Sequence, residues 1–217
     1  MRFLTPSNTW CAAKVMMKLV LALLGCYALG SLPTAYLFVQ WFKRVDIRTV
    51  GSGNVGATNA LRTAGVWIGA AVFVMDVLKG VLAAALIPRW EGLPTAPVLP
   101  WVCGFAAVVG HDFPCWLRFQ GGKGVATTIG ALIGSSPLVA ALVVGVWLVV
   151  FAASRYVSLA SLAAAVTIPT SQLALHRSLD ETVMGCILAT LMVVRHRANL
   201  HRLLSGAEHR AWSADKS

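Results

Sequence analysis

Long uncharged apolar segments constrain this chain more than any other feature. The first runs from Leu19 to Val39 without a charged side chain, and a helix that crosses a bilayer needs about 20 such residues. It ends in Trp41-Phe42-Lys43-Arg44, an aromatic and basic boundary, whereas a secretory signal ends in a small-residue cleavage site. We therefore expect a retained transmembrane helix and an all-α integral membrane protein, because helices satisfy their own backbone hydrogen bonds in lipid.

The overall composition supports this fold class. Hydrophobic residues make up 58% of the chain and charged residues 12%, whereas soluble domains carry roughly 45–50% and about 25%. So little charge cannot cover a surface that faces water. We expect a single membrane domain over residues 1–217. The five cysteines form no CxxC pair, which favours small buried side chains over a disulfide framework or a zinc site.

Further apolar segments predict the remaining helices. The segment 125–153 contains Gly134-Ser135-Ser136-Pro137, and because the residue before a proline disfavours helix, we expect two helices there, the first of them short. Together with the first segment this predicts about seven transmembrane helices. The other segments cover about 66–88, 98–117, 156–175 and 182–198.

The distribution of basic residues predicts the orientation, because cytoplasmic loops are enriched in Lys and Arg. We expect the N-terminus outside and the C-terminus in the cytoplasm. The outer segments then hold only Arg2, Lys14, Arg89 and Arg177. The inner loops and tail hold Lys43, Arg44, Arg48, Arg62, Arg118, Lys123, Arg155, Arg195, Arg197, Arg202, Arg210 and Lys216.

The net charge of +10 indicates an anionic partner. Nucleic acid is excluded as a partner class, because most of the chain would lie in lipid and its basic loops lack interleaved aromatic residues. Lipid headgroups and small anions remain.

The first polar segment is GSGNVGATNALR, from Gly51 to Arg62. It contains GxGxxG, but a dinucleotide site needs a preceding strand, and here an apolar helix is expected. A flexible turn is the simplest alternative. The interleaved side chains favour a phosphate cradle, because glycines let backbone N–H groups approach an anion while hydroxyls and amides add donors. Those side chains are Ser52, Asn54, Thr58 and Asn59.

The second polar segment is GHDFPCWLRFQGGKGVAT, which includes His111 and Lys123. It is not a Walker A loop, since Gly124 stands where that motif has Ser or Thr. Its Gly-Gly-Lys-Gly sequence opens a helix, whose N-terminus favours anions. The alternatives are a structural role for His111 and an anchoring role at the membrane face for Lys123.

The third polar segment is RHRANLHRLLSGAE, from Arg195 to Glu208. Its leucines fall on one helical face, so a basic amphipathic anchor on anionic lipid is a serious alternative. That alternative leaves Asn199 and Glu208 unexplained.

Asp76 and Lys79 stand one turn apart inside an apolar segment, where charge is costly, and we expect them to form a self-neutralising structural pair.

Together, these three segments resemble the motifs of the bacterial acyl-phosphate:glycerol-3-phosphate acyltransferases, the PlsY family. The resemblance covers about residues 18–208, which implies an acyltransferase core there, a variable extension at 1–17 and a tail at 209–217. The family transfers a fatty acyl group from acyl phosphate to the 1-hydroxyl of glycerol 3-phosphate, which makes lysophosphatidic acid. The resemblance therefore implies acyl phosphate, glycerol 3-phosphate and membrane lipids as partners.

The resemblance also implies roles for individual residues. The first loop with Gly121 and Gly122 should hold the acyl-phosphate headgroup, and Glu208 should tether the last segment to a basic neighbour. The catalytic residues it implies are Ser52, Arg62, Lys123, His196 and Asn199. The substrate-binding residues it implies are Ser52, Gly53, Asn54, Thr58, Asn59, His111, Gly121 and Gly122.

The chemistry is expected to need no acyl-enzyme, because acyl phosphate already carries a good leaving group. The glycerol hydroxyl would attack directly while cations and amides stabilise the developing charge. The proton acceptor stays open between the substrate phosphate, His111 and His196. We expect no cofactor and no metal, a monomer or weak oligomer, and an active site on the cytoplasmic face of the inner membrane.

A transporter of phosphorylated anions is the competing class, but it would place charges along a path across the membrane.

Overall fold

The computed structural model describes residues 6–211, apart from the side chains of 6–9 and 11, and this part of the chain is helical without a strand. The predicted basic residues Arg2 and Lys216 lie outside the described residues. The helices in chain order are α1 (Pro6–Ser31), α2 (Thr34–Lys43), α3 (Ala57–Ala64), α4 (Val66–Val81), α5 (Leu99–Asp112), α6 (Val125–Ser135), α7 (Pro137–Ser154), α8 (Val157–Ala174), α9 (Leu179–Arg195) and α10 (Arg197–Leu204).

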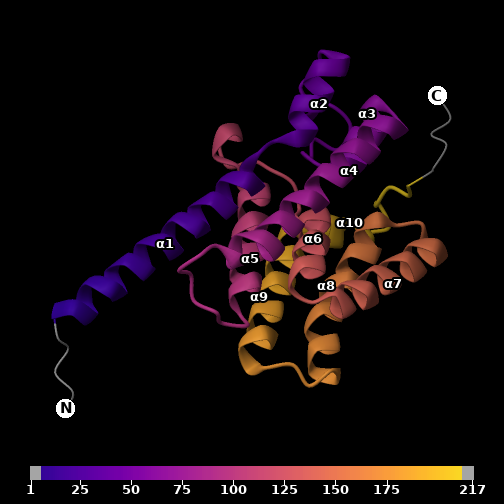
Figure 1. Cartoon of the computed structure of the whole chain (residues 1–217). Helices are drawn as coiled ribbons and strands as arrows, with labels where there is room; N and C mark the ends of the chain where they lie inside the picture. The colour runs from indigo at the N-terminus through magenta and orange to yellow at the C-terminus, as the bar shows by residue number, and fades with distance from the viewer. Residues whose placement is uncertain (1–5, 212–217) are drawn as a thin grey trace.

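The first apolar segment differs from its prediction in two details. Its helix begins at Pro6, well before Leu19, and it is broken at Leu32-Pro33 into α1 and α2. The segment Ala12–Lys43 still counts as one candidate membrane span, so the predicted span is present, but its helix is broken. Pro33 has no N–H to donate and disfavours helix at the residue before it. The N-terminal end of α1 extends away from the helical body, and α2 follows the other end of α1, beside α3 and α4 (Figure 1).

The other apolar segments fold close to their predicted bounds. The break before Pro137 separates the short α6 from α7, which confirms the prediction of two helices there. The helix α4 continues through a π-helical turn, Leu82–Leu86, and a 3-10 turn, Ile87–Arg89.

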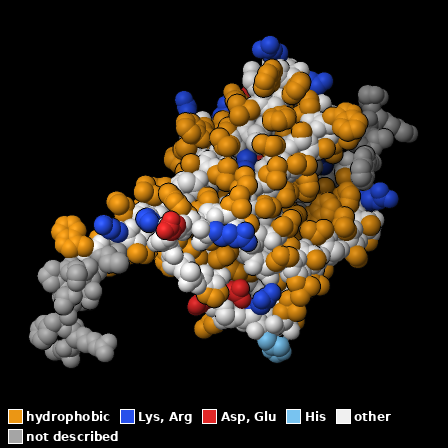
Figure 2. All heavy atoms as spheres, in the orientation of Figure 1, with side chains coloured by type: hydrophobic (Ala, Val, Ile, Leu, Met, Phe, Trp, Pro, Cys, Tyr) orange, Lys and Arg blue, Asp and Glu red, His pale blue; other side chains and the backbone are white. Residues whose placement is uncertain are grey.

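The surface of the helices is that of an integral membrane protein. Val149 on α7 and Leu173 on α8 expose 70% and 64% of their area, and hydrophobic side chains dominate the face seen in Figure 2. Among the described residues, four helical segments are long and apolar enough to cross a membrane. There are five if the α9–α10 pair, bent by 61°, counts as one.

The helices pack closely enough to fix the loops between them. The core centres on Trp101 of α5, Leu132 of α6 and Ile168 of α8, all fully buried. The helices α4 and α6 touch through glycine, because a Cβ on Gly130 would come within 1.9 Å of the Val77 carbonyl oxygen. Small residues allow such close backbone approach in membrane helices.

The two charges inside α4 form the predicted structural pair. The Lys79 Nζ lies 2.8 Å from Asp76 Oδ1, and both side chains are buried. The Thr34 hydroxyl donates to the same carboxylate oxygen at 2.6 Å. The pair is therefore neutralised, and it fastens α4 to the start of α2.

Candidate active site

The three polar segments of the sequence meet in the fold. The first runs from the loop after α2 into α3, the second runs from the end of α5 to the start of α6, and the third lies around the bend between α9 and α10. The second touches the first near Val55, whose carbonyl oxygen would lie 2.8 Å from a Cβ on Gly122. The second also bonds the third, since Lys123 Nζ donates to Asn199 Oδ1 at 2.6 Å.

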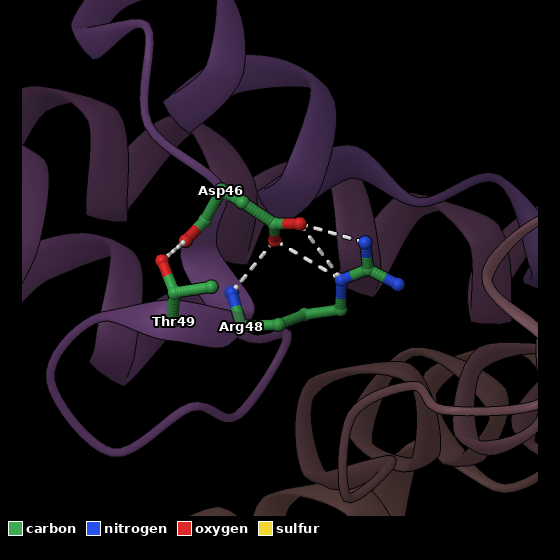
Figure 3. A network of polar contacts seen from close by, with 3 residues as sticks. All are labelled: Asp46, Arg48 and Thr49. Carbon is green, nitrogen blue, oxygen red and sulfur yellow. Dashed lines mark hydrogen bonds and ion pairs between the residues drawn. The ribbon is translucent and has the colours of Figure 1, made fainter.

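The approach to the first loop is held by a local ion pair. Asp46 caps the 3-10 turn Ile47–Thr49 by accepting from the Arg48 N–H, and its carboxylate also pairs with the Arg48 guanidinium at 2.6 Å (Figure 3). The hydrogen bond from the Arg48 side chain lowers the pKa of Asp46. Asp46 therefore neutralises Arg48, so this arginine adds no net charge next to the glycine loop.

The side chain of Asn59 organises the first loop through hydrogen bonds to backbone groups. Its side-chain amide donates to the carbonyls of Ile47, Val50 and Asn54, each at 3.1 Å, and its Oδ1 accepts from the Ser52 N–H at 3.0 Å. Asn59 is almost fully buried. The side chain of Asn59 therefore bonds to the backbone of the 3-10 turn and of the glycine loop, and it holds the two together.

The tip of the first loop is left free for a ligand. Ser52 is exposed, and only its backbone N–H is held by the protein. Gly51 and Gly53 have φ values of +59° and +68°, the left-handed region that favours glycine. The side chains of Asn54, Thr58 and the exposed Arg62 make no hydrogen bond or ion pair with the described residues, so they too are available.

The second loop uses its glycines differently from expectation. The Gly121 N–H donates to the Asp112 carbonyl at 3.2 Å, and the Gly122 N–H donates to the His111 carbonyl at 3.1 Å. A Cβ at Gly122 would come within 2.0 Å of His111 Nε2. These two glycines therefore provide close packing against His111, and their amides are already satisfied within the protein.

Lys123 supplies the cation of the second loop. Burial lowers the pKa of its ammonium to about 8, and the positive charges of Arg202, Arg195 and Arg62 act in the same direction against the opposing effect of Glu208. The group is half-buried and bonded to Asn199. A cation held among other cations, with one neutral partner, is suited to receive a dianion.

His196 lies just beyond the end of α9 and is buried. Its Nδ1 lies 2.8 Å from the Met192 carbonyl oxygen. A carbonyl can only accept, so Nδ1 carries the proton and Nε2 keeps its lone pair. Burial and the charge of Lys123 lower the pKa of His196 to about 4. The ring is therefore neutral near pH 7 and offers an acceptor.

Glu208 ties the third segment together, as predicted. It pairs with Arg202 at 2.7 Å, accepts from Asn199 Nδ2 at 2.7 Å, and accepts from the Ser158 hydroxyl on α8 at 2.9 Å. Burial opposes its ionisation, but these hydrogen bonds outweigh burial and lower its pKa. Glu208 thereby fixes the orientation of the amide that contacts Lys123.

One residue at this centre was absent from the predicted set. Arg195 donates from its guanidinium to the carbonyl oxygens of Gly121 and Gly122. Sequence alone grouped it with the basic residues of a membrane anchor, and no local pattern distinguishes it from Arg197.

The fold and the site together define a class of protein. This is a helical membrane protein that gathers three polar loops, rich in cations and hydrogen-bond donors, at one place. The family model for glycerol-3-phosphate acyltransferase matches residues 20–206, and the chain belongs to that family.

Individual relatives cover nearly the whole chain. It is 42% identical to the glycerol-3-phosphate acyltransferase of Synechococcus elongatus over 202 residues, which is 90% of this chain and 96% of the relative. It is 43% identical to that of Myxococcus xanthus over 194 residues, 89% of this chain and 100% of the relative.

Solved structures show the same architecture. The crystal structure of PlsY, an integral membrane glycerol 3-phosphate acyltransferase, in its glycerol 3-phosphate form superposes with a TM-score of 0.82 at 39% identity, covering 88% of this chain and 94% of that one. The lysophosphatidic acid form gives a TM-score of 0.80 at 38% identity over the same shares.

Proposed function

We propose that this chain transfers a fatty acyl group from acyl phosphate to the 1-hydroxyl of glycerol 3-phosphate, which gives lysophosphatidic acid and inorganic phosphate. The observation that supports the proposal is the presence of two separate sets of hydrogen-bond donors and cations at one centre. One is the free tip of the first loop. The other surrounds the Lys123–Asn199 contact. Two phosphorylated substrates need two such sets, whereas a donor such as acyl-CoA would need room for a nucleotide.

The acceptor phosphate is assigned to the set around Lys123. The ammonium of Lys123 is bonded to the neutral Asn199 at 2.6 Å, and Arg62 is exposed and without a partner among the described residues. A phosphate dianion between these two cations gains charge-assisted hydrogen bonds. His196 presents its free Nε2 lone pair to the hydroxyl of the glycerol.

The donor phosphate is assigned to the tip of the first loop. The hydroxyls of Ser52 and Thr58 and the amide of Asn54 have no hydrogen-bond partner among residues 6–211, and Gly53 leaves room for close approach. Gly121 and Gly122 pack closely against His111, and this packing supports the subsite. The acyl chain would lie along the apolar helices.

The reaction needs no covalent enzyme intermediate. The glycerol 1-oxygen forms a bond to the acyl carbonyl carbon, the bond from that carbon to the phosphate oxygen breaks, and its electron pair leaves with the phosphate. The hydroxyl proton passes to the departing phosphate or to His196 Nε2. Holding both substrates in line supplies much of the rate enhancement. Among the described residues no base is hydrogen-bonded to the Ser52 hydroxyl, as would be needed to make it a nucleophile.

The topology is part of the same proposal. About seven crossings, an outer N-terminus and a cytoplasmic C-terminus would place all three polar loops on the cytoplasmic side of the inner membrane. The meeting of these loops in the fold supports a single face for the chemistry. A monomer contains every group that the proposal uses.

The test is the donor requirement of the purified protein. In detergent, with glycerol 3-phosphate present, palmitoyl phosphate should give lysophosphatidic acid and palmitoyl-CoA should give at least about a hundredfold less. Lys123→Met is the matched negative control. Equal turnover with the two donors would overturn the assignment of the donor.

A further inference from the structure

Arg195 has contacts unlike those of any other basic residue in the third segment. Its Nε lies 3.1 Å from the Gly122 carbonyl oxygen, and its Nη2 donates to the carbonyls of Gly121, at 3.2 Å, and of Gly122. The guanidinium is stacked over the Phe113 ring at 4.9 Å. It also lies 3.8 Å from the fully buried carboxylate of Asp112.

These contacts fix two successive peptide units. In a trans peptide the C=O and the N–H point in opposite directions. In the first unit the Gly121 carbonyl faces Arg195, and the Gly122 N–H accordingly reaches the His111 carbonyl on the other side. In the second unit the Gly122 carbonyl faces Arg195, so the Lys123 N–H points away from it. No group of the described residues accepts a hydrogen bond from that N–H.

Arg195 also alters the strength of this free donor. A guanidinium on the carbonyl of a peptide polarises the whole unit and strengthens its N–H as a donor. Asp112 and Phe113 hold the guanidinium from its other sides. The arginine is therefore itself positioned, which a freely moving surface cation would not be.

Arg197 provides the contrast within the same segment. It lies only two residues further on, is exposed, and has no hydrogen bond or ion pair with the residues that the structure describes. The two arginines share charge and sequence context, so a general electrostatic role would apply to both. Only Arg195 touches the second glycine loop.

We propose that Arg195 is a positioning residue for the donor substrate: it orients the peptide between Gly122 and Lys123 so that the Lys123 N–H binds a phosphoryl oxygen of acyl phosphate. This rests on the proposed function, in which the second loop lies against the subsite of the donor phosphate. The Lys123 ammonium sits on a flexible four-carbon stem, so a small shift of the backbone leaves its bond to Asn199 intact. The backbone N–H has no such freedom, and loss of Arg195 therefore affects the donor more than the acceptor.

The experiment is a kinetic comparison of Arg195→Lys and Arg195→Met with Arg197→Lys and Arg197→Met. Initial rates are measured with palmitoyl phosphate and glycerol 3-phosphate, each varied while the other is saturating. We expect both Arg195 variants to raise the KM for palmitoyl phosphate by about 10- to 100-fold, because charge-assisted bonds to the loop are lost. The KM for glycerol 3-phosphate should change by less than about threefold, and the Arg197 variants by less than about twofold in either constant.

Phe113→Leu keeps the test decisive if the Arg195 variants fold poorly. It removes only the ring beneath the guanidinium, and it should raise the same KM by about two- to fivefold. An unchanged donor KM in the folded variants overturns the inference, as does an equal rise in both KM values or an equal effect at Arg197. Wild-type protein that is inactive with palmitoyl phosphate would instead refute the proposed function, so the two failures are distinguishable.

Discussion

The two glycine loops look alike in sequence but are built in opposite ways. The first is organised from within by one side chain, Asn59, and leaves the hydroxyl of Ser52 exposed at its tip. The second is organised from outside: the amides of Gly121 and Gly122 donate to the segment His111–Asp112, and their carbonyls accept from Arg195. The first loop thus presents side chains, while the second presents Lys123.

Glycine therefore serves two purposes in this site. At Gly51 and Gly53 it permits a left-handed backbone. At Gly121 and Gly122 it permits close approach, since a Cβ there would collide with the backbone or ring of His111. Breaking the organiser of one loop should therefore leave the other intact.

The largest effect is expected at Lys123, the group that the second loop presents. Lys123→Met removes the cation assigned to the acceptor phosphate and leaves Asn199 Oδ1 without its partner. We expect kcat/KM to fall by about a thousandfold. Lys43→Met, a change to an exposed lysine at the end of α2, is the control and should retain full activity. Substantial activity in Lys123→Met would contradict the assigned role.

Asn59→Ala tests the organiser of the first loop. It leaves three backbone carbonyls and the Ser52 N–H without their partner, so we expect about a hundredfold loss of activity and a loss of about 2–4 kcal/mol in the free energy of unfolding. Thr63→Ala, which removes a single bond to the Asn59 carbonyl, should cost far less of both. Equal effects at the two positions would mean that Asn59 does not organise the loop.

Ser52→Ala tests whether the Ser52 hydroxyl binds substrate or stabilises the loop. The Ser52 hydroxyl has no partner in the part of the chain that the structure describes, and its backbone N–H stays bonded to Asn59. Activity should therefore fall by about 10- to 100-fold while thermal stability in detergent stays unchanged. Ser52→Thr should keep part of the activity. A large drop in melting temperature for Ser52→Ala would show that the hydroxyl is structural.

The pH dependence distinguishes the cation of the second loop from the neutral donors of the first. Burial lowers the pKa of Lys123 to about 8, so the free enzyme loses this positive charge as the pH rises through that value. We expect kcat/KM for glycerol 3-phosphate to fall about tenfold per pH unit above pH 8. Lys123→Arg should retain some activity and show no such fall, because guanidinium stays protonated. Parallel profiles for the two proteins would exclude Lys123 as the titrating group.

The smallest effect is expected at the exposed pair before the first loop. Arg48→Ala removes the ion pair of Figure 3 but keeps the Asp46 cap on the 3-10 turn. Exposed pairs contribute little, so the melting temperature should shift by no more than about 2 °C and activity should stay unchanged. A marked loss of activity would place Arg48 among the substrate-binding groups.

Several features could be predicted because they depend on local sequence. The split before Pro137 and the membrane fold follow from apolar length and from proline geometry. The pairing of Asp76 with Lys79 follows from their spacing in an apolar helix, where neither charge is tolerated alone. The tether at Glu208 followed from the resemblance to the family, and its basic partner, Arg202, lies nearby in the chain.

The features that could not be predicted depend on the orientation of peptide groups in the packed structure. The sequence gives no sign that the amides of Gly121 and Gly122 are already bonded, because their acceptors lie on the preceding helix. Arg195 and Arg197 are the same residue type in the same short basic sequence. The bend between α9 and α10 places them in different environments. The break at Pro33 was missed because the apolar run continues through it without a charge.

The most direct test of direct transfer between two phosphate subsites is a labelling experiment. Purified protein is incubated with palmitoyl phosphate radiolabelled in the acyl chain, without glycerol 3-phosphate, and is then denatured and freed of lipid. The account predicts no label on the protein, and labelled lysophosphatidic acid once glycerol 3-phosphate is added to a parallel sample. A stable adduct that depends on Ser52 and passes into lysophosphatidic acid would contradict it.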